Sequence, residues 1–182
     1  MQSHRIVGAA WLALIGGALL WLGVRIYDVV TRPALIRESA LAPRLALQDL
    51  EGRSLELGER SLLLLDFWHH ACRPCLAAFP VFERLQTDYG PRGLGYVGIH
   101  VGDELEAVRA VTEGLALDFA LDGGEVARVY GVHTLPTLVL VDRERRVRKV
   151  YRKGAAEELL RRDLDRLLEA RHAKRHHPFR RQ

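Results

Sequence analysis

The sequence predicts an α/β protein, a sandwich of helices around a mixed β-sheet, preceded by one transmembrane helix. Apolar runs that are typical of buried strands alternate with stretches of helical periodicity from residue 62 onward. Near the C-terminus, two strands joined by a charged turn form a closing hairpin, which makes the sheet mixed. Near the N-terminus, residues 6–24 carry no charge.

The uncharged segment 6–24 has about the length needed to cross a bilayer, and Trp21 is placed to mark one interface. A cleaved signal peptide has a shorter apolar region that ends at a small-residue cleavage site, whereas Arg25 follows here. We therefore expect an N-terminal flank at 1–5, an uncleaved anchor and a tether at 25–43. Lysine and arginine counts slightly favour a cytoplasmic C-terminal side, but long domains translocate despite such flanks, so charge leaves the orientation open.

The N-terminal half of the domain combines strands and one long helix. Short alternating stretches on either side of Glu51-Gly52 predict a β-hairpin over 45–57. The nearly continuous apolar run 62–68 predicts a strand buried on both faces. A helix is expected over 72–89, where a glycine-proline pair ends it. β-branched and aromatic residues then predict a strand over 94–101.

The C-terminal half supplies the remaining elements. A helix capped by Asp103 is expected to run to about Glu113. Apolar periodicity predicts the later elements: a short helix at 124–130, strands at 137–141 and 147–151, and a helix at 155–170. The folded domain is thus expected over 44–170.

The last residues, 171–182, hold five lysines and arginines and no acid. We interpret them as a solvated, disordered basic tail, with contact to anionic lipid as the alternative. The body of the chain has no basic stripe interleaved with aromatic residues, so a nucleic-acid partner is not expected.

The two cysteines of the chain stand in Cys72-Arg73-Pro74-Cys75, directly after the buried strand. Two cysteines at this spacing can share the first turn of a helix, where their sulfurs are close enough to bond. A disulfide that closes so short a loop adds little stability, because loop-closure entropy grows with loop length. The pair is therefore better explained by redox chemistry than by structural cross-linking.

Three sequence features together resemble the thioredoxin superfamily. They are Asp66-Phe67-Trp68 followed three residues later by Cys72-x-Pro74-Cys75, the loop Tyr130-Gly131-Val132-His133-Thr134-Leu135-Pro136-Thr137, and Gly154 after the last strand. The resemblance spans about 45–170. With its anchor and the insertion at 102–123, the chain is most similar to the membrane-anchored TlpA-like (ResA/DsbE-like) branch.

This resemblance implies a thioredoxin-like three-layer sandwich and a thiol-disulfide oxidoreductase that needs no cofactor. It also implies a bacterial inner-membrane protein whose catalytic domain faces the periplasm. Its partners would be a membrane electron donor of thiol-disulfide type, membrane lipid around the anchor, and protein thiol or disulfide substrates such as apocytochrome c or other envelope proteins. The resemblance favours a reductant, while the residues leave the direction of electron flow open.

The residues themselves assign roles to the motif. Cys72, at a helix N-terminus, is the candidate nucleophile, because backbone N–H groups and the helix dipole favour a thiolate. Cys75 would resolve the mixed disulfide. TlpA-like proteins often carry a glutamate where this chain has Ala78, so Asp66, if buried with a raised pKa, is the expected proton acceptor.

Other residues are expected to shape the site. Leu135, Pro136 and Thr137 would bind substrate as an extended strand, with Pro136 in the cis form. Trp68 is expected to pack beneath the site, and Pro74 to sit early in the helix, where its missing N–H costs little.

Positive charge near Cys72 is expected to adjust its chemistry. Arg73, together with His69 and His70, would stabilise the thiolate and raise the reduction potential above the value of about −270 mV for thioredoxin.

Two rival functions remain open from the residues. His69, His70, Cys72 and Cys75 offer nitrogen and sulfur ligands to zinc or copper, with His133 able to approach from the proline loop. The second rival is a peroxidase of peroxiredoxin type. That chemistry uses a threonine three residues before the reactive cysteine, and this chain has His69 there.

Overall fold

The computed structural model describes residues 15–25, 27, 34–55 and 60–175, and it divides the chain into two compact units, 1–33 and 34–182. In the first unit, residues 15–25 are helical. Among the described residues, no helix combines the length and the apolar character that a membrane crossing requires. Residues 6–14 of the predicted anchor and the flank 1–5 lie outside the described residues, so the anchor stays a prediction.

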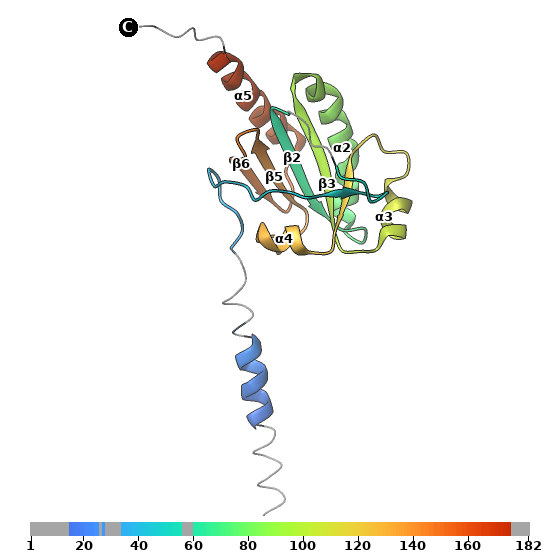
Figure 1. Cartoon of the computed structure of the whole chain (residues 1–182), viewed down its shortest axis with the longest axis vertical. Helices are drawn as coiled ribbons and strands as arrows, with labels where there is room; N and C mark the ends of the chain where they lie inside the picture. Colours follow the sequence, from blue (N-terminus) through green and yellow to red (C-terminus); the bar gives the residue numbers. More distant parts are fainter. Residues whose placement is uncertain (1–14, 26, 28–33, 56–59, 176–182) are drawn as a thin grey trace, which may run out of the picture. The chain divides into compact units, whose positions relative to one another are not determined.

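The second unit is built on a mixed sheet (Figure 1). In the described residues its strand order is β1-β4-β3-β2-β5-β6. β2, β3 and β4 run parallel, whereas β1, β5 and β6 are antiparallel to their neighbours. The strands are β1 (Gln48–Asp49), β2 (Leu62–Trp68), β3 (Leu94–Val101), β4 (Phe119–Asp122), β5 (Thr137–Asp142) and β6 (Val147–Arg152). The predicted mixed sheet is confirmed, and so are the predicted bounds of β2 and β3.

Two apolar cores cover the two faces of the sheet, because alternate residues of each strand point to opposite sides. On β2, Leu62 and Leu64 belong to one core, while Leu65 and Phe67 belong to the other. The first core is closed by α2, α3 and α5, and the second by α4 and the segment that precedes β1. The helices are α2 (Arg73–Tyr89), α3 (Leu105–Thr112), α4 (Glu125–Val129) and α5 (Glu157–Arg175), with a short 3-10 turn, η1 (Gly90–Arg92), after α2. The three-layer sandwich is confirmed.

The hairpin predicted over 45–57 is present in a short form. An isolated antiparallel bridge joins Gln48 to Ser54, and the Asp49 and Leu55 N–H groups donate to the Arg53 and Leu47 carbonyls, each at 2.9 Å. The Asp49 carboxylate also accepts the backbone N–H groups of Glu51 and Arg53, each at 2.9 Å, so a side chain helps to hold the turn. The strand β1 itself has two residues and pairs with β4.

The region 102–123, interpreted from sequence as an insertion that contains one helix, also contains the unpredicted strand β4. Its four residues are too few for a clear local pattern, and pairing with β3 defines it, with Phe119 opposite Gly98. The helix before it starts later than predicted: Glu104, rather than Asp103, is the residue before α3, and no side chain caps it.

The domain boundaries also differ from the prediction. Residues 34–43, expected to be part of the tether, pack on the folded unit: the Ile36 N–H donates to the Tyr130 carbonyl at 2.9 Å, and Ala42 is buried. Gly131 permits this approach, because a Cβ there would collide with the backbone of Ala34. At the other end, α5 continues to Arg175, so the predicted disordered tail begins too early; residues 176–182 lie outside the described residues.

Candidate active site

The predicted site residues meet at one edge of the sheet, where β2 and β3 end and β5 begins. Phe67 pairs with Thr137, and Trp68 pairs with His100. The turn that leads from β2 to α2 therefore lies beside both the proline loop and the end of β3. Strand register brings these segments together across about thirty and seventy residues of sequence.

The two cysteines form a disulfide with an S–S distance of 2.00 Å. Cys72 is the N-cap of α2 and is half-buried, whereas Cys75 is fully buried against the core. The Cys75 N–H donates to Cys72 Sγ at 3.3 Å, and the first turn of α2 carries no acidic residue. This environment favours negative charge on the outer sulfur when the disulfide opens.

Arg73 and Pro74 occupy the exposed first turn of α2, as predicted. Both lie beside the outer sulfur in sequence, and Pro74 takes a position at which the helix has no N–H bond to lose.

Asp66 lies in the middle of β2 and is fully buried, which excludes a carboxylate in contact with water. Because side chains alternate along a strand, Asp66 faces the same side as Leu64 and Trp68. That side holds the core that contains Cys75. The structure thus places the carboxyl group in the layer of the buried sulfur.

One hydrogen bond reaches the Asp66 carboxyl group: the Tyr96 hydroxyl donates to Oδ2 at 3.0 Å. The other oxygen, Oδ1, is buried and has no partner among the described residues. Burial raises the pKa of Asp66 to about 7, and the bond from Tyr96 lowers it in part. A carboxyl group with this pKa can take up and release a proton near neutral pH.

Tyr96 was not predicted, and its reach to Asp66 depends on Gly98. A Cβ at residue 98 would lie 2.6 Å from the Phe119 ring and 3.0 Å from the Tyr96 hydroxyl. The sequence does carry a signal for the contact between Tyr96 and Asp66. Because side chains alternate along a strand, Tyr96, Gly98 and His100 lie on one face of β3, beside Asp66 and Trp68 of β2.

Trp68 packs beneath the site, as predicted. It is fully buried, and its ring makes edge contacts with Phe79, His100 and Phe119 at centroid distances of 5.0, 5.0 and 5.6 Å. It therefore supports the turn that carries His69 and His70.

The proline loop has the predicted cis bond between Leu135 and Pro136. Thr137 is buried, and its hydroxyl donates to the Thr134 carbonyl at 2.6 Å. The Pro136 carbonyl accepts the Gly154 N–H at 3.0 Å. Of the three predicted substrate contacts, Pro136 and Thr137 are buried, and Leu135 is half-buried beside the exposed Thr134.

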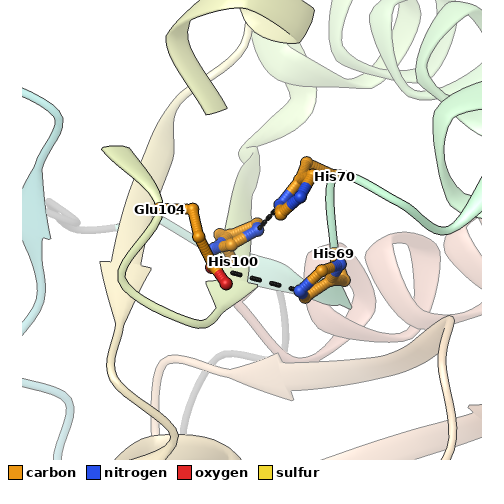
Figure 2. A group of neighbouring side chains, drawn as sticks. All are labelled: His69, His70, His100 and Glu104. Carbon is orange, nitrogen blue, oxygen red and sulfur yellow. Dashed lines mark hydrogen bonds and ion pairs between the residues drawn. The ribbon is translucent and has the colours of Figure 1, made fainter. Parts of the chain in front are cut away.

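A second group of polar side chains borders the site (Figure 2). His69 and His70 lie with His100 and Glu104, and their donor atoms are all within 4.8 Å of one another. His100 is fully buried, and burial lowers its pKa. The metal site considered as a rival function therefore has other ligands than the sequence suggested. Both sulfurs are in the disulfide, and His69 and His70 lie with His100 and Glu104, neither of which was a predicted ligand.

Comparison with known proteins agrees with this geometry. Residues 39–150 match the AhpC/TSA family. The thiol-disulfide oxidoreductase ResA of Halalkalibacterium halodurans is 32% identical over 132 residues, which cover 70% of this chain and 75% of that protein. ResA of Bacillus subtilis is 30% identical over 145 residues, 76% of this chain and 81% of that protein.

Solved structures show the same fold. A protein assigned as the thiol:disulfide interchange protein DsbE of Chlorobium tepidum superposes with a TM-score of 0.67 at 26% identity, covering 73% of this chain and 99% of that one. StoA of Bacillus subtilis has a TM-score of 0.58 at 20% identity and covers 68% of this chain and 98% of that one, a likeness in fold.

Proposed function

Because the chain belongs to the AhpC/TSA family and is a thiol-disulfide oxidoreductase of the ResA type, we propose that it reduces disulfides of envelope proteins from a membrane tether. The observation that carries this proposal is the pair of sulfurs at the start of α2, one accessible and one buried, beside a buried carboxyl group whose pKa is near neutrality.

The reaction begins with the reduced protein. The Cys72 thiolate attacks a substrate disulfide, so that a Cys72–substrate bond forms and one substrate thiolate leaves and takes up a proton. Cys75 then loses its proton and attacks Cys72, which releases the second substrate thiol. The substrate gains two electrons, the protein loses two, and the Cys72–Cys75 disulfide of the structure is the product.

Asp66 is the proposed acceptor of the Cys75 proton. The carboxyl group and the sulfur face the same core, from which bulk water is excluded, so a thiol there needs an internal base. The free Oδ1 atom is available for that proton, directly or through a water molecule.

Substrate docks on the exposed side of the proline loop in this proposal. Thr134 is exposed and Leu135 is half-buried, so this stretch can accept an extended peptide next to Cys72. Side-chain recognition by Thr137 has no support, because that residue is buried and bonded internally.

The proposed location is the outer face of a bacterial cytoplasmic membrane, with residues 6–24 as the anchor. The uncharged run of nineteen residues supports it. A membrane donor of thiol-disulfide type would return electrons to the cysteine pair. Apocytochrome c and other envelope proteins with exposed disulfides are the proposed substrate class.

Trapping tests the redox function. In the Cys75→Ser variant the mixed disulfide cannot be resolved, so envelope substrates should remain bound to Cys72 and dissociate on reduction. The matched Cys72→Ser variant should trap none of them. Equal trapping by both variants would contradict the assignment of separate roles to the two cysteines, and trapping by neither would contradict the exchange reaction.

The direction of electron flow is tested separately. The purified reduced protein is mixed with an oxidised peptide that carries the two cysteines of a haem-attachment motif. The expected result is stoichiometric appearance of peptide thiols together with the Cys72–Cys75 disulfide. The protein would be an oxidant instead if the reduced form left the peptide disulfide intact and the oxidised form converted peptide thiols to a disulfide.

Fractionation and a reporter fusion test the tether. The full chain should sediment with membranes, and a variant without residues 1–33 should stay in the soluble fraction. Alkaline phosphatase, which is active only outside the cytoplasm, should be active when fused after Gln182. A soluble full chain or an inactive fusion would exclude the proposed topology.

A further inference from the structure

We propose that His69, His70, His100 and Glu104 form a binding site for one divalent transition-metal ion, for which Zn²⁺ is the probe. The site borders the cysteine pair but uses neither sulfur, so it is independent of the redox function proposed above. Its four side chains come from the end of β2, the end of β3 and the residue before α3.

The distances between donor atoms suit such an ion. All four donor atoms lie within 4.8 Å of one another, and His70 Nδ1 is 3.2 Å from His100 Nε2. With Zn–N bonds of about 2.0–2.1 Å, two nitrogens of a tetrahedral site are about 3.3–3.4 Å apart. The His70–His100 pair is thus already close to the spacing that both ligands require.

His100 is oriented in advance for coordination. It is fixed by burial and by its edge contact with Trp68. Its Nδ1 lies 3.3 Å from the Gly102 carbonyl, an acceptor, so Nδ1 carries the hydrogen and the Nε2 lone pair points toward His70. Metal-binding histidines commonly donate their second ring nitrogen to a carbonyl in this way.

Gly102 keeps the histidine and the carboxylate close together. Its φ of +146° is a backbone conformation that residues other than glycine rarely adopt, and a Cβ at this position would meet the Glu104 carboxylate and lie 3.1 Å from His100 Cε1. The Glu104 Oε2 atom is 4.0 Å from His69 Nε2, and a dashed line joins these two side chains in Figure 2. Glu104 is exposed, so its carboxylate can move inward onto an ion.

His69 is the ligand that must adjust most. Its Nδ1 accepts the Ala71 N–H at 3.1 Å, which places the ring hydrogen on Nε2 in the metal-free protein. Coordination through Nε2 requires that this bond be given up. His70, His100 and Glu104 therefore form the primary set, with His69 or water in the fourth position.

The donor types select the class of ion. Imidazole nitrogens with one carboxylate suit Zn²⁺, Cu²⁺ or Ni²⁺, whereas Mg²⁺ and Ca²⁺ prefer sites built from oxygen. Since the cysteines are not ligands, the oxidised protein should bind the ion. A site made of His69, His70 and the two sulfurs would instead require the reduced protein.

Zn²⁺ titration of the oxidised, untagged full chain tests the site by competition with a chromophoric chelator. One Zn²⁺ should bind per chain, and excess Mg²⁺ should not displace it. His70→Ala and Glu104→Gln should each weaken binding by at least about 10- to 100-fold, the loss seen when the shell around a metal ligand is disturbed. Glu104→Gln tests the site even if His70→Ala folds poorly, because residue 104 is exposed.

Two control variants separate this site from the other histidines and acids of the chain. His172→Ala combined with His176→Ala and His177→Ala should leave the affinity unchanged, as should Glu106→Gln on the first turn of α3. Loss of binding in the triple tail variant, or equal affinity in the wild type and both ligand variants, would overturn the proposal. So would binding that appears only after reduction of the disulfide.

Discussion

The domain contains two buried aspartates that each accept a hydrogen bond from a tyrosine. Asp66 is bonded by Tyr96 at 3.0 Å in the middle of the sheet. Asp163, on α5, is bonded by Tyr151 of β6 at 2.7 Å. The second pair has a cation as well, since Arg166 contacts Asp163 Oδ1 at 2.9 Å.

The difference lies in what surrounds each carboxyl group. Both oxygens of Asp163 have partners, and a guanidinium balances its charge. Asp66 has no cation among its hydrogen-bond partners in the described part of the chain, and its Oδ1 has no partner there, so burial raises its pKa to about 7. The contacts of Asp163 tie α5 to the sheet, whereas the surroundings of Asp66 leave a carboxyl group that can exchange a proton.

The largest effect should appear in the pH dependence of stability. In the unfolded chain an aspartate ionises near 3.8, whereas folded Asp66 keeps its proton until about pH 7. The contribution of Asp66 to the free energy of unfolding should therefore fall as pH rises from about 4 to 7, by up to about 4 kcal/mol. Asp66→Asn removes this loss, so its stability relative to the wild type should increase over the same range in urea unfolding.

The control for that experiment is Asp163→Asn. This variant loses a charge-assisted bond to Arg166 and should gain no stability over the wild type at any pH. If the difference in the free energy of unfolding between the wild type and Asp66→Asn is independent of pH, Asp66 is ionised in the folded protein.

The same pair of variants should separate in activity. Asp66→Asn removes the proposed proton acceptor and should slow resolution of the mixed disulfide by about 100-fold, at the lower end of what general bases contribute. Asp163→Asn should stay within about twofold of the wild type, because the hydrogen-bond partners of Asp163, Tyr151 and Arg166, have no role in the proposed reaction. Single-turnover reduction of a disulfide peptide, with the mixed disulfide followed by mass spectrometry, measures both; equal rates would remove Asp66 from the mechanism.

Truncation of the structural aspartate should have a smaller effect and act on stability alone. Asp163→Ala leaves the buried Tyr151 hydroxyl without its acceptor, at a cost of about 2 kcal/mol in the free energy of unfolding. Urea unfolding at pH 7 measures this cost. Peptide reduction by the variant should proceed at the wild-type rate, and a large loss of activity would show that the two pairs are coupled.

The smallest effects concern the tyrosines. Tyr96→Phe and Tyr151→Phe should each cost about 1 kcal/mol of stability. Only Tyr96→Phe should also shift the pH profile of activity. The lost bond lowers the pKa of Asp66, so without it Asp66 should become a base only at higher pH. If the pH profile of activity, measured from pH 5 to 9, shifts equally in both variants, the distinction between Tyr96 and Tyr151 is contradicted.

Features set by local pattern were predictable. The continuous apolar run of β2 and the β-branched and aromatic residues of β3 defined both strands, and the cysteine spacing placed the sulfurs on the first turn of α2. β4 was missed because four residues carry little local signal, and it exists through its pairing with β3. The packing of residues 34–43 was missed for a similar reason, since it depends on Gly131 and Tyr130 far along the chain.

The sequence by itself predicted the alternating strands and helices of the sandwich and the redox pair, because both can be recognised in residues that are neighbours along the chain. The burial of Asp66, a condition in the sequence analysis, was decided by the structure. Tertiary structure alone decided that Tyr96 bonds Asp66 and that His70 meets His100 and Glu104. Those contacts follow from the register of β2 against β3, with Asp66 beside Gly98 and Trp68 beside His100. Register is set by the packing of whole sheet faces, and no single stretch of sequence contains it.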